Sequence, residues 1–127
     1  MKVLVTGANG FVGSALVEHL RAQGHYVVAA TRGQTKNSVA VGVLTSATDW
    51  TLALRGCDAV VHTAARVHQM KEQAADADAL YRETNVEATL NLARQAVVAG
   101  VRRFVFLSSI KAMGEAGRFS EATPCRP

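Results

Sequence analysis

The stretch VTGANGFVGSALVEHL, residues 5–20, places glycines at 7, 10 and 13 between an apolar run and a helix-like pattern. The run that leads into it, residues 2–6, is apolar and β-branched, which predicts a strand buried on both faces. After the glycines, apolar residues recur at helical spacing as far as Leu20, and Gly24 is expected to end that helix. The stretch therefore predicts a strand, a tight turn and a helix in immediate succession.

The rest of the chain continues this alternation of strands and helices. Further strands are expected at residues 26–31, 38–44, 58–65 and 102–109, and helices at residues 47–56 and 78–99. Thr48 or Asp49 is expected to cap the shorter helix, and Gly100 to end the longer one. The residues after 109 collect Gly, Ser, Thr and Pro without a period, which indicates a loop.

Strands that alternate with helices predict right-handed crossovers and a parallel sheet. The fold class expected is α/β, with an open, doubly wound sheet of about five strands in the order 3-2-1-4-5. Ligands bind such sheets outside the carboxyl ends of the strands. A binding site is therefore expected after residues 6, 31, 62 and 107.

Composition excludes several functional classes. The 127 residues are 49% apolar and 19% charged, as in one compact globular domain, and no run is long enough for a membrane span. The net charge of +4 is scattered, without the basic stripe and aromatic residues that a nucleic-acid groove needs. Cys57 and Cys125 match no metal-ligand spacing and are interpreted as free thiols in the cytoplasm. Because residues 1–7 run directly into strand-like sequence, no signal peptide is expected.

The three glycines carry a chemical expectation. Gly7 would allow the tight turn, Gly10 would let the backbone approach a ligand, and Gly13 would let helix and sheet pack closely. The N–H groups of the first helical turn and the helix dipole would then favour a pyrophosphate. No carboxylate stands between Glu18 and Asp49 to bind a ribose 2′-hydroxyl, and Arg32 stands after the second strand instead. Arg32 is either a solvated loop residue or a partner for a 2′-phosphate, with Lys36 assisting, and we favour the phosphate.

Four further polar residues leave alternatives open. Asn85 falls on a largely apolar helical stripe, where it would either pin a neighbouring loop or contact a ligand. Ser108 and Ser109 reach the carboxyl edge of the sheet, where they would either orient a substrate or cap the next turn. His62 lies within apolar sequence, which is more typical of a hydrogen-bonded structural histidine than of a base or a metal ligand.

Three stretches resemble signatures of one family. TGANGFVG at 6–13 resembles a TGxxGxxG fingerprint, VVHTAA at 60–65 a fourth-strand signature, and TNVEATLNLARQAVVAGVRRFVFLSSIKAMGE at 84–115 a long helix, strand and serine loop. Together they resemble the extended short-chain dehydrogenase/reductases, within the NAD-dependent epimerase/dehydratase family. SSIKAMGE at 108–115 is most similar to nucleoside-diphosphate-sugar epimerases, dehydratases and 4-ketosugar reductases.

The resemblance implies a role for each matching residue. The pyrophosphate and adenosine side of the cofactor would be lined by Gly7, Gly10, Phe11, Val12 and Gly13, and the adenosine ribose would meet Thr31 and Arg32. The middle of the cofactor would pass Thr63, Ala64 and Ala65, and its nicotinamide end would lie near Asn85. Ser109 matches the catalytic serine of the family, and Lys111 would face the substrate.

The sequence departs from the family pattern at two places. Many relatives carry an aspartate after the third strand for the adenine amine, whereas this chain has Val43, so adenine recognition would be weaker or rest on packing. The catalytic YxxxK pair of the family, an acid/base tyrosine and a lysine, is absent from the 127 residues, because the last tyrosine is Tyr81 and Asn85 follows it.

The residues and the resemblance together predict an NAD(P)-binding Rossmann domain over residues 1–127, the amino-terminal part of a nucleotide-sugar epimerase, dehydratase or reductase. We expect it to prefer NADP over NAD, not to turn over a sugar substrate, and to expose apolar surface where later elements would pack. The long helix carries a second apolar stripe from Val86 to Val97, which predicts that the helix is buried on two sides. The resemblance implies a possible homodimer, because relatives commonly dimerise through this helix. The alternatives are a complete, non-catalytic NADP-sensing module and a ketoreductase for flavonoid-like or steroid-like carbonyls.

Overall fold

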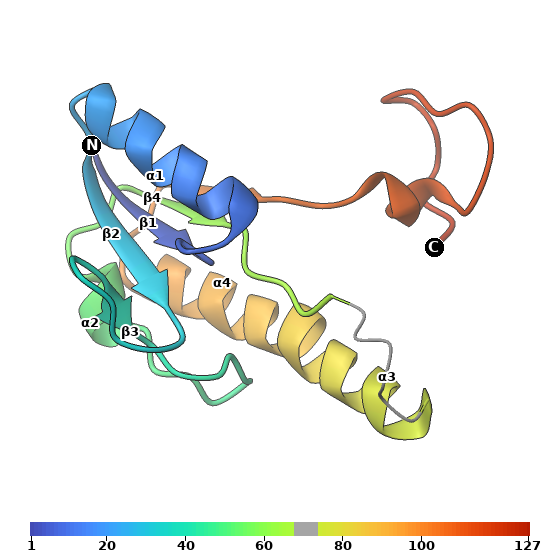
Figure 1. Cartoon of the computed structure of the whole chain (residues 1–127), viewed down its shortest axis with the longest axis horizontal. Coiled ribbons are helices and arrows are strands. Elements are labelled where there is room, and N and C mark those ends of the chain that lie inside the picture. The colour runs from blue at the N-terminus through green and yellow to red at the C-terminus, as the bar shows by residue number, and fades with distance from the viewer. Residues whose placement is uncertain (68–73) are drawn as a thin grey trace.

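The computed structural model describes residues 1–67 and 74–127, which form one parallel sheet with helices on both faces (Figure 1). The strands are β1 Lys2–Thr6, β2 Tyr26–Thr31, β3 Val39–Ala40, β4 Ala59–His62 and β5 Arg103–Phe106. Their order is β3-β2-β1-β4-β5, and every neighbouring pair is parallel. The expected fold class and strand order are therefore confirmed.

Two apolar layers hold the helices onto the sheet. The helices are α1 Phe11–Ala22 on one face, and α2 Thr51–Leu54, α3 Ala74–Arg82, the π turn η1 Glu83–Glu87 and α4 Ala88–Val98 on the other (Figure 1). Val3 and Val5 pack with Val17 of α1, whereas Leu4 packs with Leu92 of α4. Successive residues of a strand point to opposite faces, which is why β1 is apolar throughout.

Four expected elements are shorter than their sequence patterns indicate. The strands expected over 58–65 and 102–109 are regular only at Ala59–His62 and Arg103–Phe106. The strand expected over 38–44 is regular only at Val39–Ala40, although Val41 N–H still donates to the carbonyl of Thr31, the last residue of β2, and Gly42 N–H to that of Arg32. Gly42 then takes a φ of 72°, which turns the chain out of the sheet. The helix expected over 47–56 is the single turn Thr51–Leu54.

Long-range contacts explain why the shorter helix starts late. The segment before α2 is bound to α4, where the side-chain amides of Gln95 and Asn91 both donate to the Thr48 carbonyl at 2.8 Å. Gln95 Oε1 also accepts from the N–H of Trp50, the residue that precedes α2. The N-cap residue is Trp50 rather than Thr48 or Asp49, although the Asp49 carboxylate accepts from the N–H of Thr51, the first residue of α2, at 2.8 Å.

The long helix differs from expectation in shape and in burial. It begins at Ala74 and contains the π turn Glu83–Glu87 in its middle, rather than running unbroken over 78–99. Its inner stripe, which includes Leu92, is buried as expected. The second stripe is not buried, since Leu90 is 43% and Val97 is 77% exposed. The chain as a monomer therefore leaves one face of α4 uncovered.

The strand β5 lies at one edge of the sheet and leads into the tail of the chain. Phe106 and its two sequence neighbours are about half exposed on this edge strand, as expected for apolar surface that no further element covers. The tail forms the single 3₁₀ turn η2 Ile110–Met113 where a loop is expected, and it leads away from the sheet (Figure 1). Among the described residues, no helix combines the length and apolar character needed to cross a bilayer.

Candidate functional site

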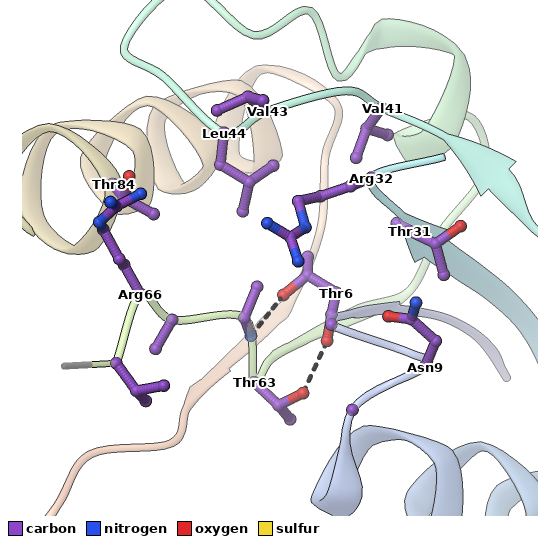
Figure 2. Close-up of a pocket in the computed structure, with 16 residues that line it drawn as sticks. Thr6, Asn9, Thr31, Arg32, Val41, Val43, Leu44, Thr63, Arg66 and Thr84 are labelled. Atoms are coloured by element: carbon purple, nitrogen blue, oxygen red, sulfur yellow. Dashed lines mark hydrogen bonds between the residues drawn. The ribbon is translucent and has the colours of Figure 1, made fainter. Parts of the chain in front are cut away.

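A cavity of about 280 Å³ opens at the carboxyl edge of the sheet, beside the ends of β1, β2 and β4 (Figure 2). Its lining consists of Thr6, Gly7, Asn9, Gly10, Ala30, Thr31, Arg32, Val41, Val43, Leu44, Thr63, Ala64, Ala65, Arg66, Val67 and Thr84. Three of the four positions expected at this edge, after residues 6, 31 and 62, contribute to it. The fourth does not, because the chain after β5 leads away from the sheet.

The glycine turn is packed tightly against its neighbours. Gly7 has a φ of 64°, and a Cβ on it would lie 2.9 Å from the Cα of Ala64. A Cβ on Gly13 would lie 2.1 Å from the Gly7 carbonyl oxygen, so Gly13 permits the turn and α1 to touch. Gly10 is the N-cap of α1, which has no side-chain cap and no acidic residue in its first turn. The N–H groups at this helix end therefore have no side-chain acceptor from the cap.

Hydrogen bonds join the end of β1 to the segment that follows β4. The Thr63 hydroxyl donates to the Thr6 carbonyl at 2.7 Å, and the Ala64 N–H donates to Thr6 Oγ1 at 3.2 Å (Figure 2). Both segments line the cavity, so these bonds fix the separation between its glycine turn and its Ala64–Ala65 side.

The cavity is electrostatically positive. Arg32 and Arg66 belong to its lining, and none of the described lining residues carries a carboxylate. Figure 2 shows the Arg32 side chain extending across the cavity between Leu44 and Thr6, with Arg66 on the far side beside Thr84. The Arg66 guanidinium also lies over the Tyr81 ring, 5.8 Å from its centroid. The Arg32 guanidinium and the N-terminus of α1 both face this cavity, and such groups are the donors that phosphate groups require.

The loop after β2 folds on itself and aims Arg32 at the cavity. The Thr31 hydroxyl lies 2.8 Å from the Gly33 carbonyl and 2.9 Å from the Ser38 hydroxyl. Lys36 lies in the same loop but is exposed and does not line the cavity. The opposite wall is apolar and contains Val41, Val43 and Leu44, so an aromatic ring placed there would meet packing surface and no carboxylate.

His62 is a buried histidine with both ring nitrogens bonded. Its Nδ1 lies 2.6 Å from Thr6 Oγ1, and its Nε2 lies 2.9 Å from Thr89 Oγ1. Burial lowers the pKa of His62 from 6.5 to about 4, so the ring is neutral at neutral pH. The interpretation of His62 as a hydrogen-bonded structural histidine is confirmed.

Asn85 binds the backbone of the loop after β4. Its Oδ1 accepts from the Arg66 N–H at 2.8 Å, and its Nδ2 donates to the Arg66 carbonyl at 3.0 Å. Of the two alternatives for Asn85, the structure shows the loop contact, and Asn85 itself does not line the cavity. Asn85 therefore affects the cavity indirectly, because it holds the backbone of Arg66, which lines the cavity.

The remaining expected site residues lie outside the cavity. Phe11 and Val12 are exposed in the first turn of α1, and Gly13 is buried behind the glycine turn. Ser109 caps the turn η2, where its hydroxyl accepts from the Lys111 N–H, and both residues are exposed on the tail. Their expected roles toward a substrate and a cofactor stay predictions.

Sequence reasoning missed several lining residues, of which Thr6, Asn9, Arg66 and Thr84 are polar. Arg66 could have been found, because it stands four residues after His62 at an edge where strands end. Thr84 could not, because the π turn that carries it was not expected. Among residues 1–67 and 74–127, no group of three potential metal ligands is clustered, and His68 lies outside the described residues.

Comparison with known proteins places this chain in a family. The model of the NAD dependent epimerase/dehydratase family matches residues 3–127. The chain is 42% identical to a UDP-glucose 4-epimerase of Vibrio cholerae, over 89% of this chain and 36% of that protein. It is 37% identical to a 3-beta-hydroxysteroid dehydrogenase of Mycolicibacterium neoaurum, over 85% of this chain and 32% of that protein.

A solved structure shows the same arrangement. MoeE5, solved in complex with UDP-glucose and NAD, matches 100% of this chain and 43% of its own, with a TM-score of 0.84 and 36% identity. The chain thus spans less than half the length of each of these proteins. With its glycine turn, parallel sheet and positive cavity, it is a member of the NAD dependent epimerase/dehydratase family.

Proposed function

We propose that the cavity binds the adenosine and pyrophosphate portion of a nicotinamide adenine dinucleotide. The observation that carries this proposal is the juxtaposition of Arg32 with the glycine turn at the N-terminus of α1, in a cavity whose described lining has no carboxylate. Gly7 and Gly10 would receive the pyrophosphate, and Val43 and Leu44 would pack on the adenine. When bound, such a cofactor supplies hydride-transfer chemistry.

Arg32 favours NADP over NAD within this proposal. It follows β2, where a carboxylate would bind the free 2′-hydroxyl of NAD, and its guanidinium is a bidentate partner for a 2′-phosphate. The solved relative MoeE5 holds NAD, so the preference is a property that we assign to this chain through Arg32.

The whole protein would act on a nucleotide sugar as an epimerase, dehydratase or reductase. Support comes from the similarity to a UDP-glucose 4-epimerase and to MoeE5 with UDP-glucose, and from Ser109 and Lys111 at the family's serine loop. The 127 residues contain no YxxxK pair, and a general acid/base contributes roughly 10²–10⁴-fold. We therefore expect the chain by itself to bind dinucleotide without turnover.

Two assays on the purified chain test this proposal. A titration followed by NADH and NADPH fluorescence should give saturable binding that adenosine diphosphate displaces. An assay of 4-ketosugar reduction should show no steady turnover. Absence of saturable binding would overturn the cofactor proposal, and steady reduction would overturn the assignment of this chain as a binding portion only.

A second candidate function has specific support. The similarity to a 3-beta-hydroxysteroid dehydrogenase favours a steroid-type or flavonoid-type carbonyl as the substrate of the whole protein. The two candidates separate in a panel of nucleotide sugars and hydroxysteroids with the longer protein. Oxidation of a hydroxysteroid is followed by reduction of NAD or NADP, whereas conversion of a nucleotide sugar is followed by chromatography of the products, because epimerisation and dehydration return the cofactor to its starting state. Reaction with steroids alone would decide against the nucleotide sugar.

The uncovered face of α4 supports a homodimer. Val86 of the π turn and Leu90 and Val97 of α4 form an apolar stripe that nothing in the described chain covers, and we infer that a second copy packs on it.

A further inference from the structure

A continuous run of hydrogen bonds passes through His62 from β1 to the π turn. Thr6 Oγ1 lies 2.6 Å from His62 Nδ1, and His62 Nε2 lies 2.9 Å from Thr89 Oγ1. Thr89 Oγ1 in turn lies 2.9 Å from the carbonyl oxygen of Asn85. The run therefore connects two strands of the sheet to the helix that covers them.

The donors and acceptors of this run define its proton positions. A carbonyl only accepts, so the single hydroxyl proton of Thr89 goes to Asn85, and Thr89 Oγ1 must accept from His62 Nε2–H. A neutral imidazole then has an unprotonated Nδ1, which accepts from the Thr6 hydroxyl. In the opposite tautomer, with the proton on Nδ1, Thr89 would have to donate to His62 Nε2, and the Asn85 carbonyl would lose the Thr89 proton. The buried Thr6 hydroxyl would accept from Nδ1–H, and its own proton would have no acceptor.

The run closes on the wall of the cavity. Thr6 Oγ1, which donates to His62, accepts from the Ala64 N–H at 3.2 Å. At the other end, the side chain of Asn85 binds both the N–H and the carbonyl of Arg66. Residues 64–66, all of which line the cavity, are thus held at both ends by groups that His62 connects.

The wall formed by residues 64–66 has little room to move toward the glycine turn. A single added carbon on Gly7 would already lie 2.9 Å from the Ala64 backbone. The His62 ring is itself confined, because it stacks on Phe106 with 5.9 Å between ring centroids and lies 6.3 Å from Phe104. The confined His62 ring, which accepts at Nδ1 and donates at Nε2, therefore links residues 64–66 to the helix that contains Thr89.

We propose that His62 is a positioning residue for the bound dinucleotide, which as the Nε2–H tautomer holds residues 64–66 at a fixed distance from the glycine turn without touching the ligand. This inference rests on the proposed dinucleotide binding, whose failure is distinguished below. It adds a role for the histidine, Thr89 and the π turn.

Paired variants of Thr89 test the positioning role. Thr89→Val removes the hydroxyl while keeping the shape, and Thr89→Ser restores the hydroxyl. We expect Thr89→Val to raise the Kd for NADPH by about tenfold, the order of one net hydrogen bond, and Thr89→Ser to return it to within about twofold of the original. Combining Thr89→Val with His62→Asn, which removes the Nε2–H donor, should weaken binding no further than the stronger single change.

Destabilisation alone is controlled by Val17→Ala. Val17 is buried under α1 on the opposite face of the sheet, so this change should lower the melting temperature with an unchanged Kd. Equal Kd values for Thr89→Val and Thr89→Ser in a chain that binds NADPH would overturn the positioning role alone. A chain that binds neither NADPH nor NADH would overturn the proposed function, and the role of His62 toward the ligand with it.

The tautomer is measured independently of any ligand. Nitrogen NMR of the chain with labelled histidine reports which ring nitrogen of His62 carries the proton, with His62→Gln identifying the signals. We expect a protonated Nε2 and an unprotonated Nδ1 at neutral pH. A proton on Nδ1 would reverse the run of donors and overturn the proposal.

Discussion

Gly13 lies against the carbonyl oxygen of Gly7, and a Cβ at position 13 would approach that oxygen to 2.1 Å. The neighbouring atoms are backbone, which has no rotamer to change, so even one added carbon must displace either α1 or the turn. The glycine at 13 thus joins the helix to the turn, while Gly7 provides the positive φ of the turn itself.

The first prediction compares two glycine substitutions. Gly13→Ala should lower the free energy of unfolding by about 3 kcal/mol, the upper range for overpacking a buried site. Gly33→Ala, where a Cβ would meet nothing within 4 Å, should change it by no more than about 1 kcal/mol. Urea unfolding measures both. Equal effects of the two substitutions would show that the contact between Gly13 and Gly7 is not as close as described.

The second prediction concerns pH. Above pH 6.5 His62 is neutral in the folded and unfolded chain, and it adds no pH dependence. Between pH 6.5 and about 4 only the unfolded chain takes up the proton, because burial lowers the folded-state pKa. The free energy of unfolding should therefore fall with decreasing pH across this window, by a total on the order of 3 kcal/mol.

The control for this prediction is His62→Gln, which cannot titrate. Hydrogen bonds lower the pKa values of Asp58, bonded foremost by the Lys2 N–H, and of Glu83, bonded foremost by the Ser46 N–H. Their stabilisation is lost only as the pH falls through these lowered values, so unfolding measured between pH 7 and 5 isolates His62. The same slope in the original chain and in His62→Gln would contradict the assignment.

The third prediction concerns the two thiols. Cys57 is buried, its Sγ donates to the Ala53 carbonyl, and burial raises its pKa, whereas Cys125 is exposed. An alkylating reagent should therefore modify one thiol rapidly in the folded chain and a second only after unfolding. Mass spectrometry counts the adducts, and Cys125→Ser should leave no rapidly modified thiol. Rapid modification of Cys57 would mean that α2 opens readily.

The fourth prediction tests the homodimer. Leu90→Lys on the uncovered face of α4 should reduce self-association, since it places a charge on the apolar stripe. Leu52→Lys alters another exposed leucine, 74% exposed on α2, and should have no effect. Light scattering after size-exclusion chromatography gives the mass of each. A monomer at all concentrations, or equal behaviour of both variants, would place any contact elsewhere.

Local patterns were sufficient to predict the sheet. The apolar runs of β1, β2 and β4 are buried on both faces, so their composition alone identifies them, and Gly24 and Gly100 both take the positive φ expected of residues that end helices. The cavity edge follows from strand order, which explains why Gly7 and Arg32 were found in advance, whereas Ala64 was named from the resemblance to the family.

Elements that depend on distant partners could not be predicted in this way. The segment before α2 follows the amides of Gln95 and Asn91 rather than its own helical pattern. The π turn accompanies the contacts of Asn85 with the backbone of Arg66, 19 residues away in the sequence. Such bonds join side chains to backbone across the sequence, and periodicity carries no signal for them.

The most direct measurement of the central claim is calorimetric titration of the chain and two charge variants with NADPH and NADH. Arg32→Gln and Lys36→Gln each remove one positive charge from the same loop, but only Arg32 lines the cavity. We predict tighter binding of NADPH than of NADH, a loss of about 10–100-fold in NADPH affinity for Arg32→Gln alone, and little change for NADH. Equal affinity for both cofactors in the unaltered chain, or equal losses for both variants, would contradict the assignment of Arg32 to the 2′-phosphate.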